Sequence, residues 1–198
     1  MEMANLIEHV FVLMLENRAF DHMLGFSGIT GQHAANGGST PINGLTGSEA
    51  NTFNGREHRV TKGADDVMPA DPGHEFNNVL EQLCGAGATY QAGGAYPAIN
   101  NAGFVASYVA SGGAANPGEV MKCFAPEQLP VLIALAQEFA VCDNWHASLP
   151  GPTWPNRMFV HAASSGGLDH SPTTEEIVEW ETIGGFQFKA GSIFDALK

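Results

Sequence analysis

Basic residues are scarce in this sequence: 8 lysines and arginines stand against 21 aspartates and glutamates, which gives a formal net charge of −13. A nucleic-acid-binding surface needs clustered lysine and arginine to replace the counterions of the phosphate backbone. The charge balance therefore argues against nucleic acid as a partner, and it disfavours anionic membrane surfaces for the same reason. Most of the acidic side chains are expected to be solvated, although some could be neutralised by a bound cation.

Cysteine is also rare, and the sequence has no long hydrophobic run. Cys84, Cys123 and Cys142 lie far apart without metal-ligand spacing, so we expect them to be reduced and structural. The start "MEMANLIEHVFVLMLEN" has no basic stretch and no small-residue cleavage site, and its apolar part is shorter than the roughly 20 residues that span a bilayer. We therefore expect no signal peptide, no transmembrane segment and, by default, a cytoplasmic location.

The apolar residues that are present favour an α/β protein. Residues 7–15, "IEHVFVLML", form a nearly continuous apolar run, which is typical of a central strand in a parallel sheet covered on both faces. The stretch "APEQLPVLIALAQEF" has the spacing of an amphipathic helix, and "AVCDNWHA", residues 140–147, follows it as a second predicted strand. Alternation of strand and helix is the rhythm of an α/β sheet.

Several shorter elements are predicted around these. We expect a short helix that ends at Gly25, an irregular stretch from Ser27 to about Gly73 with a hairpin at "TFNGREHRV", a helix in "DPGHEFNNVLEQLCG", a helix at Phe104–Val109 and a last helix capped by Ser192. With 198 residues, 44% of them apolar, the chain has room for one globular domain.

Polar residues end the first predicted strand. Glu16, Asn17 and Arg18 follow the apolar run directly, and open α/β sheets bind ligands beyond the carboxyl ends of their strands. Carboxylate and amide oxygens suit Mg²⁺, Ca²⁺ or Mn²⁺, or Zn²⁺ with carboxylate support. Glu16 and Asn17 are therefore candidate metal ligands. Alternatively, Asn17 caps the next helix and Glu16 pairs with Arg18.

The segment "SLPGPTWPNRMFVHAASS" predicts a helix with Thr153 at its N-cap and Pro155 in its first turn. A helix N-terminus presents unpaired N–H groups that attract phosphate. A divalent ion on the Thr153 oxygen would acidify the hydroxyl for in-line attack on phosphorus, which would give a phosphothreonine that water hydrolyses. The alternative is an ordinary threonine cap.

Three more residues are candidates for phosphate chemistry. Asn156 and Arg157 lie in the first turn after Thr153, and an arginine fork there could bind phosphate bidentately. The alternative role of Arg157 is a surface ion pair. His74, in "DPGH", could donate a hydrogen bond to phosphate or protonate a leaving group, or it could be a surface histidine at a helix start.

Five motifs occur together and in order: "HVFVLMLENRAFDHMLG", "DPGHEFNNVLEQL", "GFVASYV", "LPVLIALAQEFAVCDNWHASLPGPTWPNR" and "SIFDAL". The set resembles the phosphoesterase family of bacterial phospholipases C, plant non-specific phospholipases C and related acid phosphatases, over nearly the whole chain. The resemblance implies an alkaline-phosphatase-like α/β sandwich with a largely parallel central sheet flanked by helices. It also implies a divalent metal (Ca, Mg, Mn or Zn), held by Glu16 and Asn17, a Thr153 nucleophile and a phosphate-site histidine at His74.

The sequence departs from the family in length. Family members are longer, and their later half carries a His-Asp-Glu metal-ligand segment that nothing here matches. The sequence also ends within a predicted helix that has no glycine or proline stop signal. We therefore expect residues 1–198 to be a single phosphoesterase domain equivalent to the N-terminal part of a longer family domain, with an exposed sheet edge that association could cover.

The resulting functional hypothesis is a metal-dependent hydrolase of phosphoric esters, monoester or diester, with a small phosphate ester or a phospholipid head group as substrate. Two alternatives stay open. One is a catalytically incomplete fragment that binds metal or phosphate without turnover. The other is a non-catalytic interaction domain whose acidic surface contacts a basic partner. If members of the family are exported, the expected cytoplasmic location would change.

Overall fold

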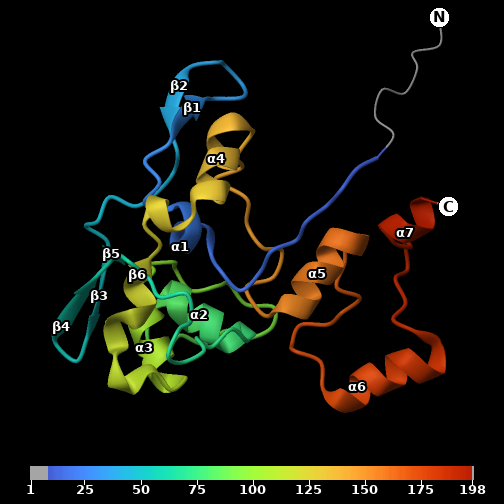
Figure 1. Cartoon of the computed structure of the whole chain (residues 1–198). Helices are drawn as coiled ribbons and strands as arrows, with labels where there is room; N and C mark the ends of the chain where they lie inside the picture. The colour runs from blue at the N-terminus through green and yellow to red at the C-terminus, as the bar shows by residue number, and fades with distance from the viewer. Residues whose placement is uncertain (1–8, 198) are drawn as a thin grey trace, which may run out of the picture.

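The α-helices of the computed structural model, which describes residues 9–197, are all short. They are α1 (Phe20–Leu24), α2 (Phe76–Cys84), α3 (Phe104–Ala110), α4 (Pro130–Glu138), α5 (Thr153–Ala162), α6 (Thr174–Glu179) and α7 (Ile193–Ala196). Figure 1 shows α1, α2 and α3 gathered in one body, while α5, α6 and α7 extend from it to one side. Helical turns of other types, at 113–115, 117–121, 126–128 and 180–184, link these helices.

The strands are equally short and form three separate two-stranded sheets. They are β1 (Thr30–Gln32), β2 (Ser39–Pro41), β3 (Ala50–Phe53), β4 (Arg56–Arg59), β5 (Thr61–Lys62) and β6 (Lys122–Cys123). The β1–β2 and β3–β4 pairs are antiparallel, whereas β5 and β6 pair in parallel, with Thr61 opposite Lys122. The described chain is thus a mixed α/β structure with small sheets.

The core lies where α3 packs against β3, the junction between β4 and β5, and the turn at 117–121 before β6. Val60, Val105 and Met121 are its buried centre, and Phe53 and Phe104 are among the partly buried side chains packed against it. Asn51 is the buried polar residue that joins β3 to α3, because its side-chain amide donates to the Asn101 carbonyl at 2.9 Å and its oxygen accepts from the Val105 amide at 3.2 Å. Burial of an amide costs little free energy when both its NH₂ group and its oxygen are hydrogen-bonded, and these bonds fix how the two elements meet.

Most of the predicted helices are confirmed. The short helix before Gly25 is α1, "DPGHEFNNVLEQLCG" contains α2, Phe104–Val109 is α3, "APEQLPVLIALAQEF" contains α4, and the helix after Ser192 is α7. The start of α5 differs by one residue from the prediction: Pro152 is the N-cap and Thr153 is the first helical residue. Proline is extended here (φ −74°, ψ 176°), so it ends the preceding loop and the helix begins with threonine.

The hairpin predicted at "TFNGREHRV" is also confirmed. Residues Asn54 and Gly55 connect β3 to β4, and both have positive φ, 49° and 74°. Two consecutive residues with positive φ are typical of the type I′ turn, whose twist matches that of the flanking strands. The rest of the stretch from 27 to 73, predicted to be irregular, contains β1, β2 and β5 as well.

The two strands predicted for a central parallel sheet do not form in the described part of the chain. Residues 9–15 are extended but pair with no other segment there, and 140–147 contain no strand either. Ile7 and Glu8, at the start of the first predicted strand, lie outside the described residues. A central strand needs hydrogen-bonding neighbours on both edges and cover on both faces, and residues 9–197 supply neither. The predicted central sheet, largely parallel, is therefore not seen in this part of the chain, whereas its α/β class is.

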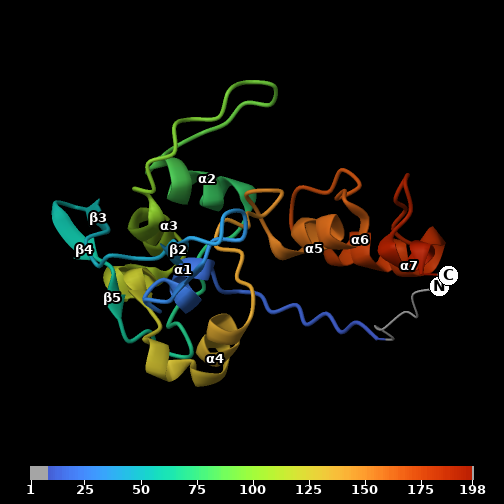
Figure 2. The same cartoon turned by 90° about the horizontal axis from the view of Figure 1, so that it is seen from above.

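The same segment, residues 9–16, is the most exposed apolar part of the described structure. Figures 1 and 2 both show it running away from the main body between α4 and α5. Its side chains Val10, Phe11, Val12, Leu13 and Leu15 are between 70 and 93% exposed. A second apolar surface lies on α4, where Val131, Leu135 and Phe139 recur at four-residue steps and are all exposed. Within residues 9–197, no helix is long and apolar enough to cross a membrane.

Candidate functional site

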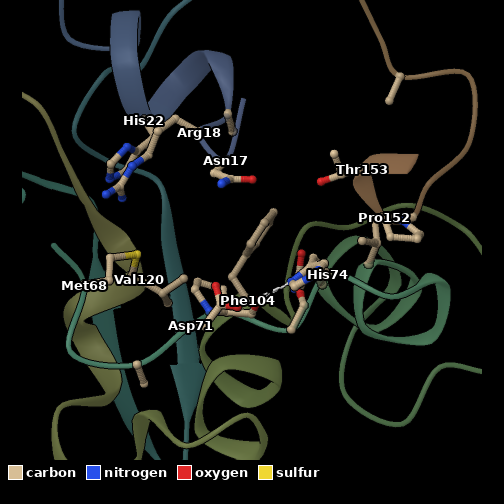
Figure 3. Close-up of a pocket in the computed structure, with 18 of the residues that line it drawn as sticks. Asn17, Arg18, His22, Met68, Asp71, His74, Phe104, Val120, Pro152 and Thr153 are labelled. Atoms are coloured by element: carbon tan, nitrogen blue, oxygen red, sulfur yellow. Dashed lines mark hydrogen bonds and ion pairs between the residues drawn. The ribbon is translucent and has the colours of Figure 1, made fainter. Parts of the chain in front are cut away.

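Four of the predicted site residues, Asn17, His74, Thr153 and Asn156, line one cavity of about 730 Å³. Asn17 comes from the turn before α1, His74 from the turn before α2, and Thr153 from the first turn of α5. Figure 3 shows the amide oxygen of Asn17 and the hydroxyl of Thr153 pointing toward one another across the cavity, with His74 below them. Residues from three distant motifs are thereby brought together around one space.

Asn17 owes its position to an unusual backbone conformation. Its φ is 67°, in the left-handed region that asparagine tolerates better than most residues. The neighbours on either side are held by separate contacts: Arg157 binds Glu16, and the Arg18 guanidinium donates to the Asp66 carbonyl at 2.8 Å. The chain therefore turns sharply at Asn17 and directs its side chain into the cavity.

His74 is half-exposed at the edge of the cavity. Its Nδ1 lies 3.2 Å from the Pro72 carbonyl oxygen and 3.8 Å from a carboxylate oxygen of Asp71. Because a carbonyl oxygen can only accept, Nδ1 is the donor in that contact. This leaves Nε2 as the nitrogen that can exchange a proton with a bound molecule.

Thr153 is placed by the residues that shape the start of α5. Asn156, three residues later, donates from Nδ2 to the carbonyls of Leu149 (2.9 Å), Gly151 (3.3 Å) and Pro152 (3.0 Å), while its Oδ1 accepts from the Leu149 amide at 3.0 Å. The Asn156 amide is thus occupied by the loop that leads into the helix. Asn156 also lines the cavity, but its polar atoms are engaged in fixing the loop.

Glu16 and Arg157 lie together and outside the lining of this cavity. Arg157 Nε donates to Oε2 of Glu16 and Nη2 donates to Oε1, both at 2.8 Å, in a bidentate ion pair. The side chains are 35% (Glu16) and 46% (Arg157) exposed. Among the alternatives left open by the sequence, the ion pair expected for Arg157 is present, with Glu16 as its partner, and the pairing of Glu16 with Arg18 is not formed.

The lining residues that were not predicted include His22, Arg18 and Asp71. Figure 3 shows His22 and Arg18 across the cavity from Thr153. Burial, together with the positive charge of Arg18, lowers the pKa of His22 below its usual value, and its Nδ1 is a buried atom without a hydrogen-bond partner in the described structure. The one signal in the sequence was proximity to a motif, since Asp71 begins "DPGH" and His22 follows Asn17 within five residues.

The oxygen donors at the cavity fit a hard divalent cation only in part. The Asn17 amide oxygen and the Thr153 hydroxyl are suitable donors, but Zn²⁺ takes at least four ligands and Mg²⁺ or Ca²⁺ six or more. In residues 9–197 no group of three or more His, Cys, Asp or Glu side chains could hold a metal ion. The described residues therefore offer part of a metal site.

The sequence matches a protein-family model and several known phospholipases C. The model of the phosphoesterase family matches residues 7–192. Non-specific phospholipase C6 of Arabidopsis thaliana is 42% identical over 194 residues, which cover 96% of this chain and 32% of that protein. Non-specific phospholipase C3 of the same plant is 39% identical over 86% of the chain, and the hemolytic phospholipase C of Pseudomonas aeruginosa is 28% identical over 81%. The chain spans about a third of the length of the plant relatives.

Proposed function

Because this chain belongs to the phosphoesterase family, we propose that it supplies the nucleophile side of a metal-dependent active site for the hydrolysis of phosphoric esters. One observation carries the proposal: Asn17, His74 and Thr153, which come from separate motifs, line the same cavity. The names of its relatives, non-specific and hemolytic phospholipases C, favour a phospholipid head-group ester as the substrate.

Thr153 is the proposed nucleophile. Its hydroxyl gives up its proton to solvent, and the oxygen forms a bond to phosphorus while the bond from phosphorus to the leaving oxygen breaks on the opposite side, which leaves a phosphothreonine and frees the alcohol. The backbone N–H groups at the start of α5 have no acceptor within the helix, so they are available for the phosphoryl oxygens. Water then cleaves the phosphothreonine and releases phosphate or a phosphomonoester, and the freed threonine oxygen takes a proton back from solvent to restore the hydroxyl.

His74 is the proposed proton donor. Since Nδ1 is held by the Pro72 carbonyl, a protonated ring would carry its transferable proton on Nε2 and give it to the leaving oxygen. The neutral ring that results could then accept a proton from the water that attacks the phosphothreonine. The same residue thus serves both halves of the reaction.

Asn17 and Thr153 are the proposed metal ligands, with Glu16 as the further ligand that the family resemblance implies. A divalent ion held there would lower the pKa of the Thr153 hydroxyl and withdraw charge from the phosphoryl oxygens. These donors fill only part of a metal ion's coordination shell. A second candidate function is therefore the binding of metal or phosphate without turnover.

The exposed apolar surfaces support a proposal about the fold and its partner. In an alkaline-phosphatase-like sandwich, residues 9–15 would be an internal strand, with neighbours on both edges and cover on both faces. Their exposure supports the proposal that further polypeptide covers them, and this sequence does not match about two thirds of the length of the plant relatives. The proposed cover is the part of the family fold that corresponds to those two thirds. A second copy is a poorer fit, because pairing through one edge would leave the other edge and one face uncovered.

The catalytic proposal is tested by replacing Thr153 with alanine, and separately with serine, in a chromogenic phosphate-ester assay with Mg²⁺, Mn²⁺, Ca²⁺ or Zn²⁺. We expect Thr153→Ala to lower turnover by at least about 1000-fold, in keeping with the loss of a nucleophile, and Thr153→Ser to keep most of it. Undiminished turnover in Thr153→Ala would remove the threonine from its role. Calorimetric metal binding without any turnover by the unaltered chain would favour the second candidate.

A further inference from the structure

The loop that follows α2, residues 85–99 (the tyrosine loop), differs in composition from the rest of the chain. From 82 to 118 the sequence has no Asp, Glu, Lys or Arg, although charged residues make up 15% of the whole chain and give it a net charge of −13. The loop consists largely of glycine and alanine, with Tyr90, Tyr96 and Ile99 as its largest apolar side chains. An uncharged segment thereby interrupts a strongly acidic chain.

The tyrosine loop is closed at its neck by hydrogen bonds, so it has a defined shape. The Leu83 carbonyl accepts from the backbone amides of Asn100 (2.9 Å) and Asn101 (2.8 Å). The Asn100 side chain also donates to the Cys84 carbonyl at 3.2 Å. Ends that meet in this way are typical of an Ω-loop, a class of compact surface loop that often carries function. Figure 2 shows this loop, between α2 and α3, projecting from the main body.

Aromatic stacking holds the middle of the tyrosine loop against the start of α2. The rings of Tyr90 and Tyr96 are stacked, with their centroids 4.3 Å apart and their planes within 9° of parallel. Tyr90 also meets the ring of Phe76, the first residue of α2, edge to face at 5.8 Å. Its hydroxyl accepts from the Gly93 amide at 3.3 Å. Tyr90 is the more buried of the two rings, and Tyr96 is exposed.

This aromatic group lies beside the cavity of the candidate site. Phe76 comes two residues after His74, and Gly151 lies close enough to Phe76 that a Cβ added to the glycine would be 3.7 Å from the Phe76 amide nitrogen. His74 and Gly151 both line the cavity. On the tyrosine loop, Tyr96 and Ile99 are 55% and 67% exposed. An exposed apolar surface therefore flanks the space in which the proposed substrate ester binds.

We propose that the tyrosine loop docks the protein on the surface of a zwitterionic phospholipid membrane and so brings lipid head groups to the neighbouring cavity. This inference rests on the proposed phospholipid substrate. A tyrosine ring combines an apolar body with a polar hydroxyl, which suits the boundary between head groups and acyl chains. An uncharged loop meets no electrostatic penalty at a surface without net charge, whereas an anionic surface would repel the acidic protein as a whole.

The backbone of the tyrosine loop distinguishes it from the apolar run at residues 9–15. That run is extended and pairs with no other segment within residues 9–197, as expected of a strand that lacks its neighbours. The tyrosine loop is instead closed on itself at its neck, and the Gly87 amide donates to the Glu81 carboxylate at its base, at 3.2 Å. Its exposed side chains are therefore suited to a surface rather than to a neighbouring strand.

The test is binding to neutral phosphatidylcholine vesicles, measured by co-sedimentation. Because residues 9–16 are themselves apolar and exposed, every protein in the comparison carries Phe11→Asp and Leu13→Asp, and this double variant is the parent. We expect the parent to bind the vesicles. Adding Tyr96→Ser with Ile99→Ser should weaken binding at least about tenfold, since burial of one large apolar side chain contributes about that factor.

The matched control is Ile193→Ser with Phe194→Ser on α7, which removes a similarly exposed isoleucine and aromatic ring and should leave vesicle binding unchanged. Ile99→Ser alone keeps the tyrosine stack, so weaker binding with an unchanged thermal midpoint separates lipid contact from loss of the loop structure. Vesicles that contain anionic lipid should bind the parent more weakly, above all at low salt. No vesicle binding by the parent, equal binding after the Tyr96 and Ile99 changes, or a preference for anionic vesicles would overturn the proposal.

Turnover assays separate the failure of this proposal from failure of the proposed function. We expect the Tyr96 and Ile99 changes to slow hydrolysis of phosphatidylcholine in vesicles at least about tenfold below lipid saturation, in line with the weaker binding, and to leave hydrolysis of a soluble chromogenic phosphate ester unchanged. Loss of the soluble activity as well would mean that the two side chains shape the cavity, and would overturn the docking role. If neither ester is hydrolysed but vesicle binding depends on the loop as expected, the proposed function is wrong and the docking surface stands.

Discussion

At the scale of single residues, one carboxylate outside the cavity is expected to make stability depend on pH. Glu49 accepts hydrogen bonds from the amides of Thr46 and Gly47 and from the Thr46 hydroxyl, at 2.8 to 3.2 Å. Burial alone would raise its pKa, but these bonds outweigh burial and lower the pKa to about 2. The turn that they close precedes β3 and positions Leu45, which packs against the core.

The predicted consequence concerns acid stability. Because the pKa of Glu49 is lower in the folded state than its ordinary value of 4.5, its contribution is present above pH 4.5 and is lost as the pH falls toward 2. We expect Glu49→Gln to lower the free energy of unfolding by about 1–2 kcal/mol at pH 7 and to bring the two proteins together near pH 2. Denaturant unfolding at pH 7, 4 and 2.5 measures this, and a difference that stays constant over this range would contradict it.

At the scale of elements, the β3–β4 hairpin depends on its turn. Gly55 has a φ of 74°, and a Cβ added there would meet no atom within 4 Å. Gly55→Ala should therefore lower the free energy of unfolding by about 1–2 kcal/mol through backbone strain alone. The control is Gly31→Ala in β1, where there is equal space and no positive φ. Thermal unfolding of the two variants is the measurement, and equal losses would show that turn strain is not the cause.

A comparison of the individual elements with the sequence shows which of them the sequence predicts well. The hairpin at Asn54–Gly55 and helices such as α2 and α4 carry their signals within a few residues, as turn residues, a terminating glycine or apolar spacing. The apolar runs at 9–15 and 140–147 carry a signal for burial but none for the partner that would bury them. Strand pairing depends on segments distant in the sequence, so a strand pattern alone could not predict its absence in residues 9–197.

The sequence likewise predicts some features of the candidate site and not others. Motifs predicted that Asn17, His74 and Thr153 would share a site, and all three line one cavity. The pairing of Glu16 with Arg157 joins residues that had separate predicted roles, since the sequence gives no distance between them. Asn156 illustrates the same limit, because its four contacts with the loop before α5 depend on how that loop folds.

At the scale of the whole molecule, the leading segment, residues 9–16, should control association. Phe11 and Leu13 are 93% and 82% exposed, so they contribute little packing to the described structure, yet together they present a large apolar area to water. We expect the chain to self-associate weakly, in a concentration-dependent way, when its partner is absent. The double variant Phe11→Asp with Leu13→Asp should be monomeric under the same conditions, with its thermal unfolding midpoint unchanged within about 2 °C.

Sedimentation velocity over a hundredfold range of protein concentration would measure this association. Ile99→Asp is a suitable control, because Ile99 is also exposed, at 67%, but lies on the loop after α2, and this variant should associate like the unaltered chain. Adding the part of non-specific phospholipase C6 of Arabidopsis thaliana that this sequence does not match should replace self-association by a one-to-one complex, and only in proteins with an intact leading segment. A chain that stays monomeric throughout, or a double variant that is clearly less stable, would mean that the apolar run is already covered within the protein.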